Sequence, residues 1–370
     1  MTEGRSGAPS FFMEITTAQF RPRVLVGMSG GVDSSLAAAL LLEQGYDVVG
    51  CFLKNWSDTK DESGACAWRS DRRDALAVAA KLGIPLVTVD AEDVYRATVV
   101  EPLYAEYAAG RTPNPDVRCN EFVKFPALAA EAARQGCAWI ATGHYARVRH
   151  AEGGSVLLKA ADPEKDQTYF LCRLPQKLLA RTLFPIGHLT KPQVREEARR
   201  RGLSTAEKEE SMGICFVGKV SLPDFLRQRI PDAPGEIVTT DGAVVGRHDG
   251  VHRFTIGQRH GLGVGGGDPW YVITTDPETR RVVVSQNEND LLSPEMQVGD
   301  AHWIAAAPTL PARLGVRIRH RQEIVAADVE AAGEMLTVRF SSPVRAVTPG
   351  QSAVFYDGDV CLGGGTIMSA

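Results

Sequence analysis

Ser29-Gly30-Gly31-Val32-Asp33-Ser34-Ser35 is the stretch that decides the fold, because it lies between an apolar run at 23–27 and an Ala- and Leu-rich run at 32–44. The first run predicts a buried strand, and the second predicts a helix that ends at Gly45. Two glycines let backbone N–H groups approach an anion closely, and a helix N-terminus adds unpaired donors and the positive end of its dipole. The stretch therefore predicts a phosphate-binding loop, with a serine-rich helix cap as the simpler alternative.

The loop lacks the G-x-x-x-x-G-K-[ST] pattern, so it is not the Walker loop that handles γ-phosphate transfer. Further apolar runs at 47–52, 85–89 and 138–141 predict strands. Helical patterns at 70–82 and 125–135 separate them. This alternation predicts an α/β fold with a doubly wound parallel sheet, which binds ligands beyond the carboxyl ends of its strands.

The pattern changes to short alternating strands separated by Gly and Pro from about residue 235 onward, which predicts a β-barrel. We expect four parts: a flexible N-terminal tail over 1–20, the α/β catalytic domain over 21–217, a small central domain over 218–285, and a C-terminal β-barrel domain over 286–370.

Composition excludes several classes of protein. The formal net charge of −4 argues against an indiscriminate nucleic-acid binder, although a local basic stripe can still serve RNA. Apolar runs are too short to cross a membrane and the N-terminus lacks a signal-peptide pattern, so we expect a cytoplasmic protein. None of the seven cysteines forms a C-x-x-C pair, which argues against zinc, iron–sulfur and thioredoxin sites.

Two cysteines lie in unusual surroundings. Cys119 follows a loop with two prolines, and the neighbouring Arg111 and Arg118 favour its thiolate, while Asp116 is placed to move a proton. Asp116 has a simpler alternative role, which is to cap the turn. Cys215 lies in the small-residue run 211–218, whose composition alone predicts a buried structural thiol.

The S-G-G-x-D-S pattern resembles the PP-loop ATP pyrophosphatases, and five further runs resemble the bacterial tRNA-specific 2-thiouridylases. They are G-R-T-P-N-P-D-V-R-C-N (110–120), A-T-G-H-Y-A (141–146), K-D-Q-T-Y-F-L (165–171), S-M-G-I-C-F-V-G (211–218) and A-V-T-P-G-Q-S-A-V-F-Y (346–356). The resemblance covers almost the whole chain after the first twenty residues.

This resemblance implies a tRNA-uridine 2-sulfurtransferase. ATP would adenylate the C2 carbonyl of the wobble uridine in tRNA, and a cysteine persulfide would then supply sulfur, giving 2-thiouridine, AMP and pyrophosphate. It assigns the persulfide to Cys215, the nucleophile that frees the sulfur to Cys119, and a redox disulfide to the Cys119–Cys215 pair. Asp116 becomes the acid/base.

The resemblance also assigns binding residues. The nucleotide would meet Gly27, Met28, Ser29, Gly30, Gly31, Val32, Asp33, Ser34, Leu53 and Gly143. The target base would meet Asn114, Pro115 and Asp116, and the rest of the tRNA would meet Lys165, Asp166, Gln167, Arg319 and His320. Mg²⁺ is expected with ATP, but no metal site made by the protein itself.

Arg317, Arg319 and Arg321 alternate with other residues, so a strand there would place all three on one face, either as a phosphate contact or as an ordinary solvated face. His144 is expected to be structural, and Cys66 has no assigned role.

The expected partners are tRNA and a persulfide donor, either a cysteine desulfurase or a sulfur-relay protein, and the expected state is a monomer. Three alternatives stay open: another PP-loop ligase, a non-catalytic tRNA-binding protein, and an iron–sulfur thiolase.

Overall fold

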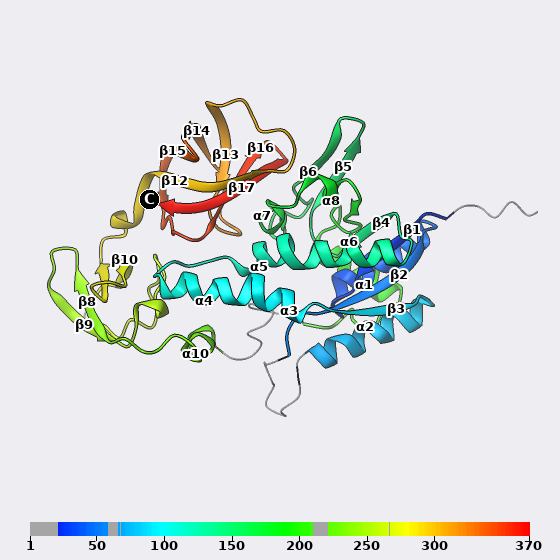
Figure 1. Ribbon diagram of the computed structural model, residues 1–370, viewed down its shortest axis with the longest axis horizontal. Helices are drawn as coiled ribbons and strands as arrows, with labels where there is room; N and C mark the ends of the chain where they lie inside the picture. The colour runs from blue at the N-terminus through cyan, green and yellow to red at the C-terminus, as the bar shows by residue number, and fades with distance from the viewer. Residues whose placement is uncertain (1–20, 58–65, 67, 210–220, 266) are drawn as a thin grey trace, which may run out of the picture.

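A five-stranded parallel sheet carries the N-terminal half of the chain in the computed structural model, which describes residues 21–57, 66, 68–209, 221–265 and 267–370 (Figure 1). The strand order is β3-β2-β1-β4-β7, and every neighbouring pair is parallel. The strands are β1 (Arg23–Gly27), β2 (Asp47–Lys54), β3 (Leu86–Asp90), β4 (Trp139–Thr142) and β7 (Thr182–Leu183). The predicted α/β class with a parallel sheet is confirmed. The predicted tail at 1–20 lies outside the described residues.

Helices cover both faces of this sheet. Val24 and Val26 of β1 belong to one buried cluster with α1, whereas Leu25 belongs to a second cluster with α6 on the opposite face. This division follows the period of two of a strand, which a parallel sheet buries on both sides. The helices are α1 (Val32–Glu43), α2 (Trp68–Leu82), α6 (Phe125–Arg134) and α9 (Lys191–Arg200).

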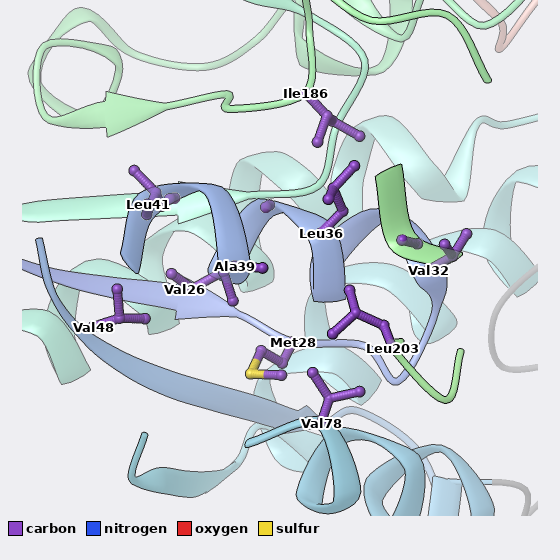
Figure 2. Packing of buried hydrophobic residues seen from close by; sticks show 14 of the residues in the cluster. Val26, Met28, Val32, Leu36, Ala39, Leu41, Val48, Val78, Ile186 and Leu203 are labelled. Carbon is purple, nitrogen blue, oxygen red and sulfur yellow. The ribbon is translucent and has the colours of Figure 1, made fainter. Parts of the chain in front are cut away.

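Helix α1 is buried around most of its circumference. Figure 2 shows Leu36 and Leu41 of this helix near Val26 of β1 and Val48 of β2. Ile186 lies above the helix in this view, and Leu203 lies below it near Met28. The packing fixes α1 directly behind the carboxyl end of β1, so the loop between them has little freedom to move.

The segment between β3 and α6 is helical but irregular. It comprises α3 (Glu92–Tyr95), the π-helix η1 (Arg96–Val100), α4 (Glu101–Ala108), α5 (Pro115–Arg118) and the π-helix η2 (Cys119–Lys124). Short π-helical stretches inside α-helices are frequent at functional sites.

Two further sheets follow. The central unit has the order β10-β11-β8-β9, with β8 (Gly235–Thr239), β9 (Val244–His248), β10 (Tyr271–Asp276) and β11 (Arg281–Ser285). It is preceded by α10 (Leu222–Arg227). The last sheet has eight strands in the order β12-β15-β14-β13-β16-β17-β6-β5, and β12 also pairs with β17, which closes a barrel. Its C-terminal strands are β12 (Leu292–Trp303), β13 (Ala312–Arg317), β14 (Val325–Ala332), β15 (Met335–Arg345), β16 (Ser352–Asp357) and β17 (Val360–Ser369).

The barrel sheet includes a hairpin from the first half of the chain. Strand β6 (Gly154–Leu158) pairs antiparallel with β17 and with β5 (Arg147–Ala151). The catalytic half and the barrel are therefore joined through a continuous hydrogen-bonded sheet.

The prediction that Arg317, Arg319 and Arg321 share one strand face is wrong. Strand β13 ends at Arg317, and Arg321 has the left-handed φ of 67°. The chain turns at this point because Arg317 is drawn inward to the buried Asp166. Within the described residues, every helix is either too short or too polar to span a membrane.

Candidate functional site

The loop between β1 and α1 lies at the carboxyl edge of the parallel sheet, between neighbouring strands β1 and β4. The chain leaves these two strands for different parts of the sheet, and ligands of such folds bind in the crevice this creates. Helix α1 starts after Gly31 without a side-chain cap among the described residues. Its first N–H groups are therefore available to an anion.

Serine hydroxyls hold the loop in its conformation. The Ser34 hydroxyl accepts from the Ser29 N–H at 3.1 Å and donates to the Gly31 carbonyl at 3.2 Å. The Ser35 hydroxyl donates to the same carbonyl at 2.8 Å. These bonds organise the loop from within.

Two glycines allow the backbone to come close. Gly30 has a φ of +78°, and a Cβ there would lie 2.2 Å from the Asp71 carbonyl oxygen. A Cβ on Gly143, just after β4, would lie 2.5 Å from the Ser34 nitrogen. Gly143 therefore packs directly against the first turn of α1, and a larger residue at either position would displace the loop.

The loop carboxylate, Asp33, is held by two side chains. Lys191 donates to both Asp33 oxygens at 2.8 and 2.9 Å, and the Tyr145 hydroxyl donates to Oδ1 at 2.8 Å. Lys191 begins α9 and Tyr145 follows Gly143, so three distant segments meet at this carboxylate.

A second lysine also contacts the loop. Lys208 donates to the Gly30 carbonyl at 3.1 Å and also pairs with Asp71 and Asp74 of α2. It lies just before the segment 210–220, which is outside the described residues. Cys215 belongs to that segment, so its predicted persulfide role and its disulfide with Cys119 stay predictions.

The remaining predicted nucleotide contact, Leu53, lies near the end of β2, two strands from β4. It pairs in register with Val89 of β3 and is partly buried against the cluster behind the sheet. The position fits the edge of the crevice, and the adenine contact stays a prediction.

Asn114, and not Asp116, caps the turn in the proline-rich loop. The Asn114 Oδ1 accepts from the Val117 N–H at 3.2 Å and begins α5. The Asp116 carboxyl is partly buried, which raises its pKa, whereas the positive charge of Lys124 lowers it. The simpler role for Asp116 is thus taken by another residue.

Cys119 starts the π-helix η2 and is only 6% exposed, in a cluster with Tyr95, Val123 and Phe225. The charges expected to activate it have other partners. Arg111 makes two bonds to Glu106 at 2.6 and 2.7 Å, and Arg118 donates to the Thr98 carbonyl at 2.8 Å. The predicted effect of these arginines on the thiolate is therefore reduced in this conformation.

A hydrogen bond links η2 to the phosphate-loop edge. Lys124 and the His144 Nε2 are 3.4 Å apart, and the His144 Nδ1 lies 2.7 Å from the Thr142 hydroxyl. Burial and the Lys124 charge lower the pKa of His144 well below its usual value, so the ring is neutral and accepts from Lys124. The Phe125 ring stacks on it at 5.7 Å. His144 thus contacts Lys124 and Phe125, and its structural role stays a prediction.

The predicted tRNA-contacting residues 165–167 differ in how buried and how hydrogen-bonded their side chains are. Asp166 is 2% exposed and accepts from Arg317 at 3.0 Å, so its carboxylate is not available to tRNA in this conformation. Gln167 accepts from the Tyr145 N–H at 2.9 Å and donates its own N–H to the Tyr145 carbonyl at 2.8 Å. Lys165 is the more exposed member of the three.

Arg319 and His320 follow the end of β13. Arg319 Nη2 donates to the Ile256 carbonyl and the Thr348 hydroxyl, both at 2.8 Å. The His320 ring lies 4.6 Å from the Phe170 ring, and burial together with nearby arginines lowers its pKa to about 4. His320 is therefore neutral at physiological pH, and its contact with tRNA stays a prediction.

Sequence reasoning missed the four residues that organise the site: Tyr145, Lys191, Lys208 and Lys124. Tyr145 and Lys124 lay within or beside the runs that were singled out, so those runs carried a signal for them. Lys191 and Lys208 had none, since only the fold brings them to the phosphate loop.

Similarity to known proteins covers all three units. The family described as "tRNA methyl transferase HUP domain" matches residues 22–219. The family "tRNA methyl transferase PRC-barrel domain" matches residues 223–286, and "Aminomethyltransferase beta-barrel domain" matches residues 293–367. These matches confirm the predicted architecture of a parallel-sheet domain, a small central domain and a C-terminal barrel.

Full-length relatives are similar across nearly the whole chain. The tRNA-specific 2-thiouridylase MnmA of Geobacillus thermodenitrificans (strain NG80-2) is 49% identical over 355 residues, which is 95% of each chain. That of Lactococcus lactis subsp. cremoris (strain MG1363) is 48% identical over 355 residues, covering 93% of this chain and 94% of the other. A crystal structure of a 4-thiouridine synthetase–RNA complex with bound ATP has 16% identity and a TM-score of 0.37 over 57% of this chain and 50% of that chain, which is too low to support a conclusion.

Proposed function

This chain belongs to the family of tRNA-specific 2-thiouridylases, and from that premise we infer that it is an ATP-dependent tRNA sulfurtransferase that makes 2-thiouridine. The predicted family, enzyme class and ATP use agree with its relatives. The residue roles below are our proposals for how this chain performs that reaction.

The observation that carries the proposal is the Lys124–His144 hydrogen bond of 3.4 Å. His144 follows Gly143, which packs on the phosphate loop, while Lys124 ends the π-helix that begins with Cys119. This bond brings the nucleotide edge and the cysteine helix together. A single site with both adenylation and sulfur chemistry needs that proximity.

In the first step, the uridine O2 attacks the α-phosphorus of ATP, and pyrophosphate leaves. The uncapped N-terminus of α1 and the loop amides bind the phosphates. Asp116 takes the proton from N3 of the base, which makes O2 a better nucleophile. The product is an O2-adenylated uridine whose AMP is a good leaving group.

Mg²⁺ fits this site as a companion of ATP. The Asp33 carboxylate on the loop is 31% exposed and provides the oxygen ligands that Mg²⁺ prefers, although Lys191 holds it already. Bound there, the ion would neutralise phosphate charge.

In the second step, the terminal sulfur of a Cys215 persulfide attacks C2 and AMP leaves, so that C2 is joined through that sulfur to Cys215. The Cys119 thiolate then attacks the Cys215 sulfur. The S–S bond to the transferred sulfur breaks, a Cys119–Cys215 disulfide forms, and 2-thiouridine leaves with its proton restored. The two cysteines are oxidised and the transferred sulfur is reduced.

Two anchors support a position of Cys215 near this site. Lys208, on its N-terminal side, bonds to the phosphate loop. Phe225 of α10, on its C-terminal side, packs in the cluster that contains Cys119. The described residues on both sides of the segment 210–220 therefore contact the two places where the sulfur of Cys215 would act.

The tRNA contacts and the domain roles complete the proposal. Lys165 and Gln167, together with Arg319 and His320, would line the tRNA path, and Asn114, Pro115 and Asp116 would meet the flipped base. The boundaries 21–217, 218–285 and 286–370 would separate catalysis, tRNA contact and the barrel. A persulfide donor, a monomeric state and a cytoplasmic location complete the proposal.

The test measures tRNA-dependent release of AMP and pyrophosphate together with nucleoside mass spectrometry, using unmodified tRNA, ATP and a persulfide source. We expect 2-thiouridine from the wild type and none from Cys119→Ala or Cys215→Ala, while both variants still bind tRNA. Cys66→Ala is the matched control, because its thiol donates to the Ser57 carbonyl and has no part in the proposed sulfur transfer.

Other outcomes identify the alternatives. Full turnover by both cysteine variants would point to another PP-loop ligase. Binding without AMP release would indicate a non-catalytic tRNA binder, and an iron-containing coloured protein would indicate an iron–sulfur thiolase. A methylated nucleoside formed without AMP would support the methyl transfer that the family description mentions.

A further inference from the structure

The loop that leads to Asp116 and Cys119 is held by the C-terminal barrel. The Thr112 N–H donates to the Pro349 carbonyl at 3.0 Å. In return, the Gln351 side-chain amide donates to the carbonyls of Thr112 at 2.9 Å and Pro113 at 3.3 Å. These residues are more than two hundred positions apart in the chain, so only the packed whole molecule makes this contact.

The barrel turn is shaped for this approach. Gly350 has a φ of +91°, and a Cβ there would lie 3.0 Å from three backbone atoms of Thr112. A residue with a side chain would both strain the turn and push the loop away. Arg319 braces the same turn, since its Nη2 donates to the Thr348 hydroxyl and to the Ala346 carbonyl.

The central unit holds the other side of the loop. The hydroxyls of Thr112 and Thr255 are 3.3 Å apart, and the Thr275 hydroxyl donates to the Gly110 carbonyl at 3.3 Å. A Cβ on Gly110 would lie 2.5 Å from the Pro277 ring. The start of the loop is therefore fixed between two units that are not part of the parallel sheet.

The loop needs outside donors because of its own sequence. Pro113 and Pro115 have no N–H, so the loop has few donors of its own for its backbone carbonyls. The carboxamide of Gln351 carries two N–H groups and meets two successive carbonyls. A carboxylate of the same shape would offer only acceptors to these oxygens.

We propose that Gln351, carried on the barrel turn Pro349–Gln351, is a positioning residue for the catalytic loop: it fixes Thr112 and Pro113 so that the Asn114-capped turn presents Asp116 and Cys119 to the target base. The role rests on the proposed function of Asp116 and Cys119. Gln351 contacts Thr112 and Pro113 and would act through the loop that they begin. Displacements of about 1 Å in such a loop can lower turnover by up to about 100-fold.

The decisive variant is Gln351→Glu, which keeps the side-chain shape and removes both donors. Gln297→Glu is the matched control in the same barrel. Among the described residues, the Gln297 side chain accepts from the Thr337 hydroxyl at 3.2 Å, which a carboxylate also does. We expect Gln351→Glu to lower single-turnover thiolation at least about 10-fold. The KM for ATP, the Kd for tRNA and the Tm should stay close to those of the control. Gln351→Lys, which restores N–H donors, should recover part of the rate.

A second readout does not depend on activity. Alkylation of Cys119 by N-ethylmaleimide, followed by peptide mass spectrometry, should become several-fold faster in Gln351→Glu, because Cys119 is 6% exposed when the loop is held. Cys172, buried in the core cluster shared with the barrel, should stay unreactive.

The outcomes separate this inference from the proposed function. Unchanged thiolation and unchanged Cys119 alkylation in Gln351→Glu would overturn the positioning role. Equal losses of Tm, tRNA binding and turnover would also overturn it, in favour of a general structural role. If the wild type makes no 2-thiouridine but Cys119 alkylation still rises in the variant, the proposed function fails while the positioning of the loop stands.

Discussion

The Asp116 carboxyl experiences two opposing effects: burial raises its pKa and the Lys124 charge lowers it. If Asp116 takes the N3 proton, it must be ionised, so activity rises as the pH increases through this pKa. Asp116→Asn removes the base and should lower thiolation by about 100-fold to 10,000-fold. Assays at fixed pH with saturating ATP and tRNA would check this, and near-normal turnover would exclude the role.

Lys124→Met should move the acid limb of the pH–rate profile to higher pH. The variant removes the positive charge that favours the Asp116 carboxylate, so the pKa of Asp116 rises and the ionised base appears only at higher pH. Lys177→Met, at an exposed lysine of α8 (Gln176–Leu179), is the control and should leave the limb in place. A limb that moves to lower pH in Lys124→Met would contradict the assignment.

Gly143→Ala should weaken ATP binding. The added Cβ would lie 2.5 Å from the Ser34 backbone nitrogen, which cannot yield without distorting the loop. Such overpacking costs about 1–3 kcal/mol. Gly153→Ala is the matched control, because a Cβ there meets nothing within 4 Å. Calorimetric titration with ATP and thermal unfolding would measure both effects, and wild-type ATP affinity in Gly143→Ala would refute the argument.

Among single residues, the phosphate loop could be predicted from the sequence, but the partners of its side chains and of the arginines near Cys119 could not. The phosphate loop was predictable because its function depends on local backbone freedom and a helix start. The partners of Asp33 were not, since Lys191 lies 158 positions away and only the tertiary fold brings it close. The charges near Cys119 were visible in sequence, but their engagement with Glu106 and Thr98 was not.

Among the elements, the segment from β6 to α7 (Thr168–Leu171) meets the barrel through a buried ion pair. Asp166 and Arg317 have side chains that are 2% and 11% exposed. Asp166→Ala would leave the Arg317 charge buried without its carboxylate, which costs about 3–5 kcal/mol. Asp328→Ala breaks the exposed pair with Arg313 and should cost about 0–1 kcal/mol. Urea unfolding of the two variants would compare them, and equal losses would contradict the burial argument.

Regular elements were predictable where the local pattern of apolar residues and glycines was clear, as in β1, α1 and α6. The hairpin β5–β6 was not, because its pairing with β17 joins positions about two hundred residues apart. The end of β13 was also missed. Alternating arginines fit a strand, but the burial of Arg317 against Asp166 overrides the local pattern.

In the whole molecule, one buried cluster includes Leu25 and Phe125 of the parallel-sheet domain together with Val354 and Tyr356 of the barrel. The central unit instead has its own small cluster, which includes Ile237 and Val282. We therefore expect β1 and β16 to unfold in one cooperative step, whereas the central unit opens at lower free energy. Native-state hydrogen exchange would measure this, and faster exchange in β16 than in β1 would contradict it.

The pairing of β6 with β17 has a consequence for inheritance. If a gene exchanged only its C-terminal third with that of a relative, β6 and β17 would come from different parents. The two strands have to match in register and in the side chains at Leu157 and Cys361. Successful recombinants must therefore cross over before residue 147 or conserve both strands. The barrel and the catalytic half are expected to descend together as one inherited unit, and a barrel built for other substrates could not simply be transplanted.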